Sequence, residues 1–291
     1  MLNLKRLAAG FLALLWAIPA WCVPGVGVSV WNPGSGTSVT STAVTTQSTG
    51  STFLCIPVYR QGGGGTLPTT VVDNKSNTYV LANSVNYGFG FSEIGVYISI
   101  NGAGGAGHTC TASGWTTSAD LLSISFVELT GMGAATLDAA PAGTNDNASP
   151  SVPPSITTTV ANEWVLNIYA NYSNNDQTIT DTGSGYAIIV KQEVGANGIT
   201  GAISYVVPAS SGTATNDSFS FTTADFAGAT AISIKPGGAG ATCTHAGWSS
   251  GGTFAVPTAG TGNYWRSNGS FATVDCSSNS YWQSSGAFGV N

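Results

Sequence analysis

The residues best suited to chemistry in this chain are aromatic and lie near the C-terminus. Three segments, WSSGGTF, WRSNGSF and WQSSGAF, share the pattern W-x-S-x-G-x-F. Their tryptophans, Trp248, Trp265 and Trp282, are 17 residues apart both times. Flat aromatic faces beside hydroxyl and amide groups suit the apolar face of a sugar ring. The repeat therefore predicts a sugar-stacking platform, and its alternative is that the same side chains pack three hairpins into a small core.

Each repeat also carries a turn signal at its shared glycine. Asn268-Gly269 in the second unit is a strong hairpin signal, because a type I′ turn needs positive φ at both central positions. A turn there would place Trp265 opposite Ala272, and it would put the tryptophan and phenylalanine of each unit on opposite faces. Arg266 could stack on or bind an anionic sugar, or be an ordinary solvated arginine. The candidate ligand-binding residues are Trp248, Trp265, Trp282, Tyr264, Tyr281 and Arg266.

Catalytic groups are sparse by comparison. The two histidines, His108 and His245, each lie two residues from a cysteine, and we expect them to be packed or surface residues. The glutamates stand singly, whereas a glycosidase needs two carboxylates about 5 to 9.5 Å apart. Neither G-x-S-x-G nor H-E-x-x-H occurs. The sequence predicts a protein that is not an enzyme, with no catalytic residue, metal site or cofactor.

The first 22 residues have the layout of a secretory signal. Lys5 and Arg6 form a charged start, residues 7–18 are apolar, and Ala20-Trp21-Cys22 has small residues at the two cleavage positions. The alternative is an uncleaved anchor, for which the apolar run is marginal in length. We expect a secreted, extracellular or virion-surface protein whose mature chain has no stable membrane span.

Four cysteines follow the signal, and an even number in an exported chain predicts disulfides. Four cysteines allow three pairings. We favour Cys55–Cys110 and Cys243–Cys276, because each pair then lies within one domain.

The composition and net charge limit the classes of partner that the protein can bind. Only 7% of the residues are charged, and the net charge is -6 with seven basic residues in 291. No basic patch is left for a phosphate backbone, so the composition excludes a typical nucleic-acid-binding protein.

The elements that must position these groups are β-strands. From Val26 to about Pro236, β-branched and aromatic runs of strand length alternate with Gly, Asn, Ser and Pro, and none keeps a helical period. This predicts an all-β antiparallel sandwich over 23–236, followed by an aromatic hairpin module over 237–291. Two sets of alternating residues are expected to share a face each: Val26, Val28 and Val30 in one strand, and Leu54, Ile56 and Val58 in another, where Phe53, Cys55 and Tyr59 face the other way.

Four motifs resemble one family. They are VVDNKSNTYVLA (71–82), SFVELTG (125–131), SITTTVANEWVL (155–166) and FAGATAISIKP (226–236). In this order they are similar to the D-x-x-x-N-T-Y hairpin, the strand end, the threonine-rich run before a central strand and the closing strand of a jelly-roll-like sandwich domain. That domain occurs in secreted bacterial surface proteins and phage structural proteins. The resemblance implies a binding or architectural module without catalytic residues, in which Glu128 of the strand-end motif is structural and Ser76 replaces the family glycine. Asp73 is expected to brace its own hairpin, because an aspartate side chain can accept hydrogen bonds from nearby backbone N–H groups.

Together these features predict a non-enzymatic extracellular or virion-surface protein. Its β-sandwich body would carry the aromatic hairpins, which recognise a glycan or cell-surface receptor, and oligomerisation would strengthen binding through multivalency. The alternative is a structural assembly subunit, such as a decoration, fibre or tail component, whose repeats contact other subunits. A carbohydrate-active enzyme is the third and least favoured reading.

Overall fold

A computed structural model describes most of the chain between 25 and 237 and four short strands beyond it. The described residues are 25–60, 64, 66–115, 119–146, 151–173, 178–181, 183, 185–193, 198–215, 217–222, 226–237, 262–265, 271–274, 280–282 and 288–290. The structure divides into two compact units, one comprising Pro24–Ala239 and the other including Gly240–Asn291. These described residues form strands and no helix. In the described part, then, no helix is long and apolar enough to cross a membrane.

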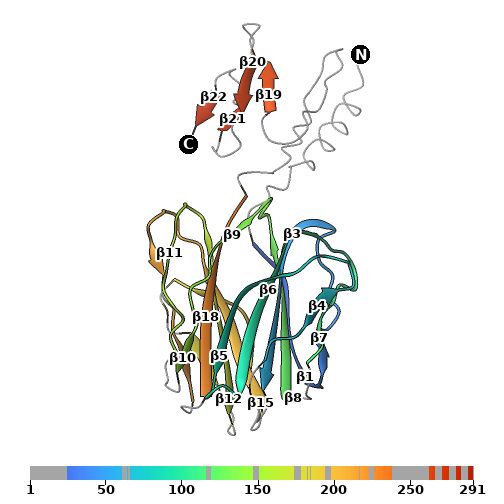
Figure 1. Cartoon of the computed structure of the whole chain (residues 1–291). Helices are drawn as coiled ribbons and strands as arrows, with labels where there is room; N and C mark the ends of the chain where they lie inside the picture. Colours follow the sequence, from blue (N-terminus) through green and yellow to red (C-terminus); the bar gives the residue numbers. More distant parts are fainter. Residues whose placement is uncertain are drawn as a thin grey trace, which may run out of the picture. The chain divides into compact units, whose positions relative to one another are not determined.

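The larger unit is an antiparallel β-sandwich, which confirms the predicted fold class (Figure 1). Its first sheet pairs five strands in the order β1-β8-β3-β6-β5. Their bounds are β1 Gly25–Gly36, β3 Thr49–Arg60, β5 Val80–Tyr87, β6 Ser92–Ala103 and β8 Ala119–Thr130. The second sheet runs β10-β18-β12-β15-β14, and β9 also pairs with β18. Their bounds are β9 Thr136–Ala139, β10 Thr144–Asp146, β12 Trp164–Ser173, β14 Ala187–Gln192, β15 Gly198–Val206 and β18 Phe226–Lys235.

The two sheets share one topology. In each, counting β10 as the first strand of the second sheet, the order by position in the chain is first, last, second, fourth, third. The chain completes the first sheet before it begins the second. The sandwich therefore consists of two successive halves with equivalent strand order, and its strands do not alternate between the two sheets as the strands of a jelly roll do.

Short accessory strands cover the outer face of each sheet. In the first half, β2 (Ser38–Thr40), β7 (Cys110–Ser113) and β4 (Thr70–Asp73) form a three-stranded sheet. In the second half the accessory pairs are β11–β16 and β13–β17. Their bounds are β11 Ile156–Thr157, β13 Ile179–Asp181, β16 Ala214–Thr215 and β17 Phe219–Phe221. Both faces of each main sheet are thus covered, which explains why the central strands are apolar on both sides.

The alternation predicted for β3 is confirmed. One set of its side chains joins the core between the two sheets, and the other set joins an outer core beneath the accessory strands. The first set is Leu54, Ile56 and Val58, and the second is Phe53, Cys55 and Tyr59. Successive side chains of a strand point to opposite faces, so a single buried strand contributes to both cores.

The common face predicted for Val26, Val28 and Val30 is wrong. Val26 packs against the core between the sheets, whereas Val30 packs against the outer core. The cause is a β-bulge: Val26 pairs with Leu129 but Ser29 pairs with Val127, so β1 contains one extra residue between these pairs. One extra residue moves every later side chain to the other face.

Candidate functional site

The aromatic repeat forms two described strand pairs at the C-terminus. β19 (Gly262–Trp265) pairs with β20 (Phe271–Val274), and β21 (Ser280–Trp282) pairs with β22 (Phe288–Val290), both antiparallel. Tyr264 and Trp265 lie in β19, and Tyr281 and Trp282 lie in β21. The prediction of a hairpin therefore holds for the strands of the second and third units.

The register differs from the prediction by one residue. Trp265 pairs with Phe271 rather than Ala272, and Trp282 pairs with Phe288 rather than Gly289. Five residues lie between Trp265 and Phe271, and five between Trp282 and Phe288, whereas the predicted pairings have six residues between them. The observed pairing is therefore centred on Asn268 and Ser285, the residues before the shared glycine. The predicted pairings of Trp265 with Ala272 and of Trp282 with Gly289 are therefore wrong. The predicted placement of the tryptophan and phenylalanine side chains on opposite faces stays a prediction, because these side chains lie outside the described residues.

Several predicted residues lie outside the described residues. These are Trp248, Arg266, His245, Cys243 and Cys276. The side chains of Tyr264, Trp265, Tyr281 and Trp282 are outside the description as well, although their backbone is within it.

The predicted disulfide between Cys55 and Cys110 is confirmed, with the two Cα atoms 6.3 Å apart. It joins β3 of the first main sheet to β7 of the accessory sheet that covers it. Both cysteines are fully buried. The crosslink therefore closes the outer core of the first half.

Asp73 braces its own hairpin, as predicted. Its carboxylate accepts hydrogen bonds from the backbone N–H groups of Lys75 (2.9 Å) and Asn77 (3.0 Å), and from the side chains of Asn77 (2.7 Å) and Tyr79 (3.1 Å). Ser76, at the position of the family glycine, has a φ of 64° and so keeps the left-handed conformation that glycine adopts more easily. Burial raises the pKa of Asp73, but the hydrogen bonds from His108, Asn77 and Lys75 outweigh it and hold that pKa below its usual value.

His108 is a packed histidine, which agrees with the expectation. Its Nε2 is 2.9 Å from the Asp73 carboxylate and its Nδ1 is 3.0 Å from Thr46 Oγ1. The ring has no exposed surface and lies edge-on to Phe53 and Phe126. Hydroxyl, imidazole and carboxylate are the groups of a nucleophilic triad. Here the hydroxyl is buried and accepts the Gly105 N–H at 2.9 Å, so the chain of hydrogen bonds fastens a loop.

The other buried carboxylates are also structural. Glu128 accepts from Gln47 N–H (2.8 Å) and Ser51 Oγ (2.6 Å), as expected for a structural residue. Glu163 accepts from the Thr159 N–H at 2.7 Å, and Asp217 accepts from the Ser218 N–H at 2.7 Å and from Ser204 Oγ. Over the described residues, no three His, Cys, Asp or Glu side chains group in a way that could hold a metal ion.

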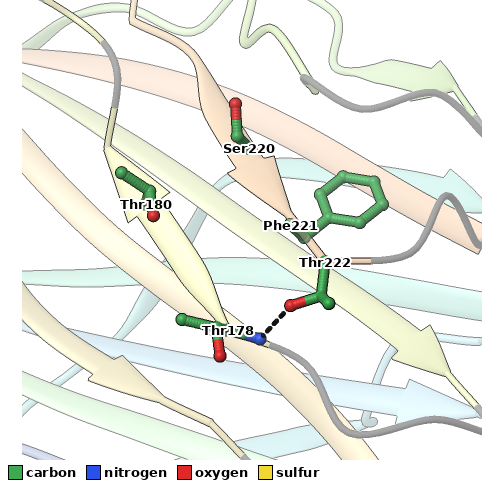
Figure 2. A pocket seen from close by; sticks show the side chains of 5 residues that line it. All are labelled: Thr178, Thr180, Ser220, Phe221 and Thr222. Carbon is green, nitrogen blue, oxygen red and sulfur yellow. Dashed lines mark hydrogen bonds between the residues drawn. The ribbon is translucent and has the colours of Figure 1, made fainter.

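A shallow hydroxyl-lined pocket lies on the ribbon formed by β13 and β17. Its lining residues are Thr178, Thr180, Ser220, Phe221 and Thr222, and its volume is about 300 Å³. Figure 2 shows Thr180 on β13 with Thr178 directly before that strand, and Ser220 on β17 with Thr222 directly after it. The Thr178 N–H donates to Thr222 Oγ1 at 2.9 Å. None of the lining side chains is charged. In the sequence, the alternation of hydroxyl and apolar residues in TIT (178–180) and SFT (220–222) signals this pocket. The pocket was not predicted, because none of its residues is a typical catalytic group.

An aromatic turn joins β5 to β6. Phe89 is 75% exposed and Phe91 is 42% exposed, and Phe89 has a φ of 58°. The Phe89 ring lies edge-on to Phe226 with the ring centroids 5.5 Å apart. The GFGF repeat of glycine and phenylalanine signals this turn in the sequence, but the turn was not among the predicted sites.

Comparison with family models, curated proteins and solved structures finds no significant match to this chain. Any assignment of function therefore depends on the residues and geometry above.

Proposed function

We propose that this chain is a non-enzymatic extracellular or virion-surface adhesive protein that recognises glycans through its C-terminal aromatic hairpins. The sandwich serves as a rigid body in this proposal, and the hairpins supply the recognition surface. The four sequence motifs that resemble a jelly-roll-like sandwich domain are compatible with these two roles, since domains of that family are binding or architectural modules.

The observation that carries the proposal is the repeated register. Trp265–Phe271 and Trp282–Phe288 occupy the same position in two ribbons that are 17 residues apart in the chain. Hairpins that repeat the same aromatic pair present equivalent aromatic positions, which suits a ligand that itself repeats, such as a polysaccharide. Stacking on aromatic rings needs no charge and therefore agrees with a chain in which 7% of residues are charged.

The hydrogen bonding of the buried carboxylates supports the proposal that the protein is not an enzyme. A glycosidase needs two carboxylates placed across one sugar linkage. The buried carboxylates of the sandwich instead accept hydrogen bonds from neighbouring backbone N–H groups, as Asp73 and Glu163 do. A carboxylate held in this way is a structural brace rather than an acid positioned in a cleft.

The proposal is tested by glycan-array binding of the full chain and of the Trp265→Ala/Trp282→Ala variant. Removing two stacking rings is expected to weaken binding about 5- to 150-fold, because each ring contributes about 0.5–1.5 kcal/mol. The matched control is Trp265→Phe/Trp282→Phe, which keeps an aromatic plane and should retain most of the binding. Unchanged binding by the alanine variant, with an unchanged unfolding midpoint, would refute recognition by the hairpins.

An assembly subunit is the second candidate, and one observation favours it. Val72, Val80 and Leu81 are 45–56% exposed on β4 and β5, the two strands joined by the Asp73–Tyr79 turn. Large apolar side chains that remain exposed can mark subunit contacts. Light scattering of the full chain tests this: an ordered oligomer that Val80→Lys dissociates supports the assembly role, and a monomer at all concentrations contradicts it.

A further inference from the structure

The turn between β5 and β6 presents two aromatic side chains where a hairpin normally carries polar residues. The turn is Gly88-Phe89-Gly90-Phe91, and Phe89 is the most exposed large apolar side chain among the described residues of the molecule. Exposing a phenylalanine forfeits the free energy that its burial would provide. The fold alone gives no reason for aromatic side chains at this position.

The backbone makes the choice of residue more unusual. Gly88, Phe89 and Gly90 are three successive residues with positive φ, at 62°, 58° and 89°. Glycine adopts this conformation easily, but a bulky residue is strained there. Glycine or asparagine would suit position 89 better, so the stability of the turn opposes the phenylalanine. Strain of this kind is found where a side chain has a function outside the fold.

The surrounding structure holds the strained turn in one conformation. The Phe89 ring lies edge-on to Phe226, and a side chain at Gly88 would come within 3.1 Å of the Phe226 Cβ. The Gly88 N–H donates to Asn145 Oδ1 at 3.2 Å. Phe89 is therefore positioned before any ligand binds, which lowers the entropy cost of binding.

The chemistry around the turn indicates the class of ligand. The segment 87–92 contains no charged residue, and the exposed amide side chains of Asn86 and Asn145 flank it. Aromatic rings bordered by amide groups match a sugar, which has an apolar ring face and a rim of hydroxyls. A lipid surface would use the rings but not the amides, and a net charge of -6 opposes approach to an anionic membrane.

We propose that the Phe89–Phe91 turn is a second glycan-contact site, carried by the sandwich and separate from the C-terminal hairpins. This inference rests on the proposed glycan recognition, but it uses residues of the other compact unit. An uncharged saccharide is the expected ligand. Phe89 stacks on the sugar ring, and the flanking amides contact its hydroxyls.

The test compares variants of the full chain on a glycan array and in thermal unfolding. Phe89→Asn is expected to weaken glycan binding about 2- to 12-fold, the effect of losing one stacking ring, and to raise the unfolding midpoint because asparagine tolerates positive φ. Phe91→Ser tests the second ring without the strain. Val160→Ser is the matched control: it removes another exposed apolar side chain of the sandwich, outside the turn, and should leave binding unchanged.

The outcomes separate this inference from the proposed function. If the Trp265→Ala/Trp282→Ala variant loses binding while both turn variants bind normally, the turn site is overturned and hairpin recognition stands. If the turn variants lose binding and the tryptophan variant keeps it, the turn site stands alone. Absence of glycan binding by the unaltered chain overturns both. Binding of the unaltered chain to phosphatidylcholine vesicles, abolished by Phe89→Asn while glycan binding persists, also overturns the glycan assignment.

Discussion

The two halves of the sandwich share one strand order but fasten their accessory strands by different chemistry. In the first half, the Cys55–Cys110 disulfide joins the accessory strand β7 to β3 of the main sheet. The buried Asp73–His108 pair joins the end of β4 to the segment before β7. The second half has no cysteine, and its accessory strand β17 is held by noncovalent packing alone, where Tyr169 of β12 stacks on Phe219 and Phe221. The first half has a comparable stack, of Tyr59 on Trp115, in addition to its disulfide.

This difference shows that the topology does not depend on either fastening. The common requirement is a central strand whose outward face is apolar and is covered by short strands. A covalent bond and an aromatic stack both satisfy it. The first half should therefore be the more sensitive to loss of a single link, and the second half should lose stability gradually as packing is removed.

The largest expected effect comes from removing the disulfide. The Cys55→Ala/Cys110→Ala variant should lose about 2–5 kcal/mol of unfolding free energy, measured by urea denaturation. Hydrogen exchange should accelerate in β2, β4 and β7 more than in β13 and β17. Equal acceleration in both halves would show that the sandwich unfolds as one unit and that the fastenings are not local.

A smaller loss is expected from truncating the aromatic stack of the second half. Phe219→Leu keeps an apolar side chain at a fully buried position but removes one ring of the stack with Tyr169. We expect a loss of about 1–2 kcal/mol in urea denaturation, below that of the disulfide variant. A loss as large as that of the disulfide variant would contradict the proposed difference between the halves.

The Asp73 brace predicts that the effect of Asp73→Asn on the unfolding free energy depends on pH. The pKa of Asp73 is lowered in the folded protein, so its contribution is complete above the usual aspartate pKa of about 3.9 and is lost as the pH falls through the lower folded value. Asp73→Asn should cost about 1–3 kcal/mol at pH 7, and less at pH 3. The measurement is the unfolding free energy of both proteins across pH 2–7. A constant difference over that range would show that the charge of Asp73 does not contribute.

The smallest effect is expected at Ser76. The second half has Gly185, with a φ of 87°, in the corresponding connection between its accessory strand and β14, whereas the first half has Ser76 at 64°. Ser76→Gly should stabilise the chain by up to about 1 kcal/mol through relief of the left-handed strain. Gly185→Ser is the reciprocal test and should destabilise by a similar amount.

Local signals explain what could be predicted in advance. The alternation of Leu54 with Cys55 showed that β3 is buried on both faces, and Asp73 lies within six residues of the backbone groups and the tyrosine that it braces. The geometry of the candidate sites was harder to predict from the sequence. The hairpin register failed by one residue because Asn268-Gly269 favours a two-residue turn, while the observed pairing spans five residues. The exposure of Phe89 could not be predicted, because nothing in GFGF states whether its rings face a core or solvent.

The amino-acid sequence predicted the all-β class and most strand positions, and it favoured Cys55–Cys110 among three possible pairings, because strand alternation, turn residues and the spacing of cysteines are local or nearly local properties. The shared strand order of the two sheets, the bulge after Val26 that reverses the faces of β1, and the exposure of Phe89 against Phe226 became visible only in the folded chain. The physical reason is that these features depend on contacts between strands up to about 140 residues apart, and the cost or benefit of such contacts exists only once the chain has folded.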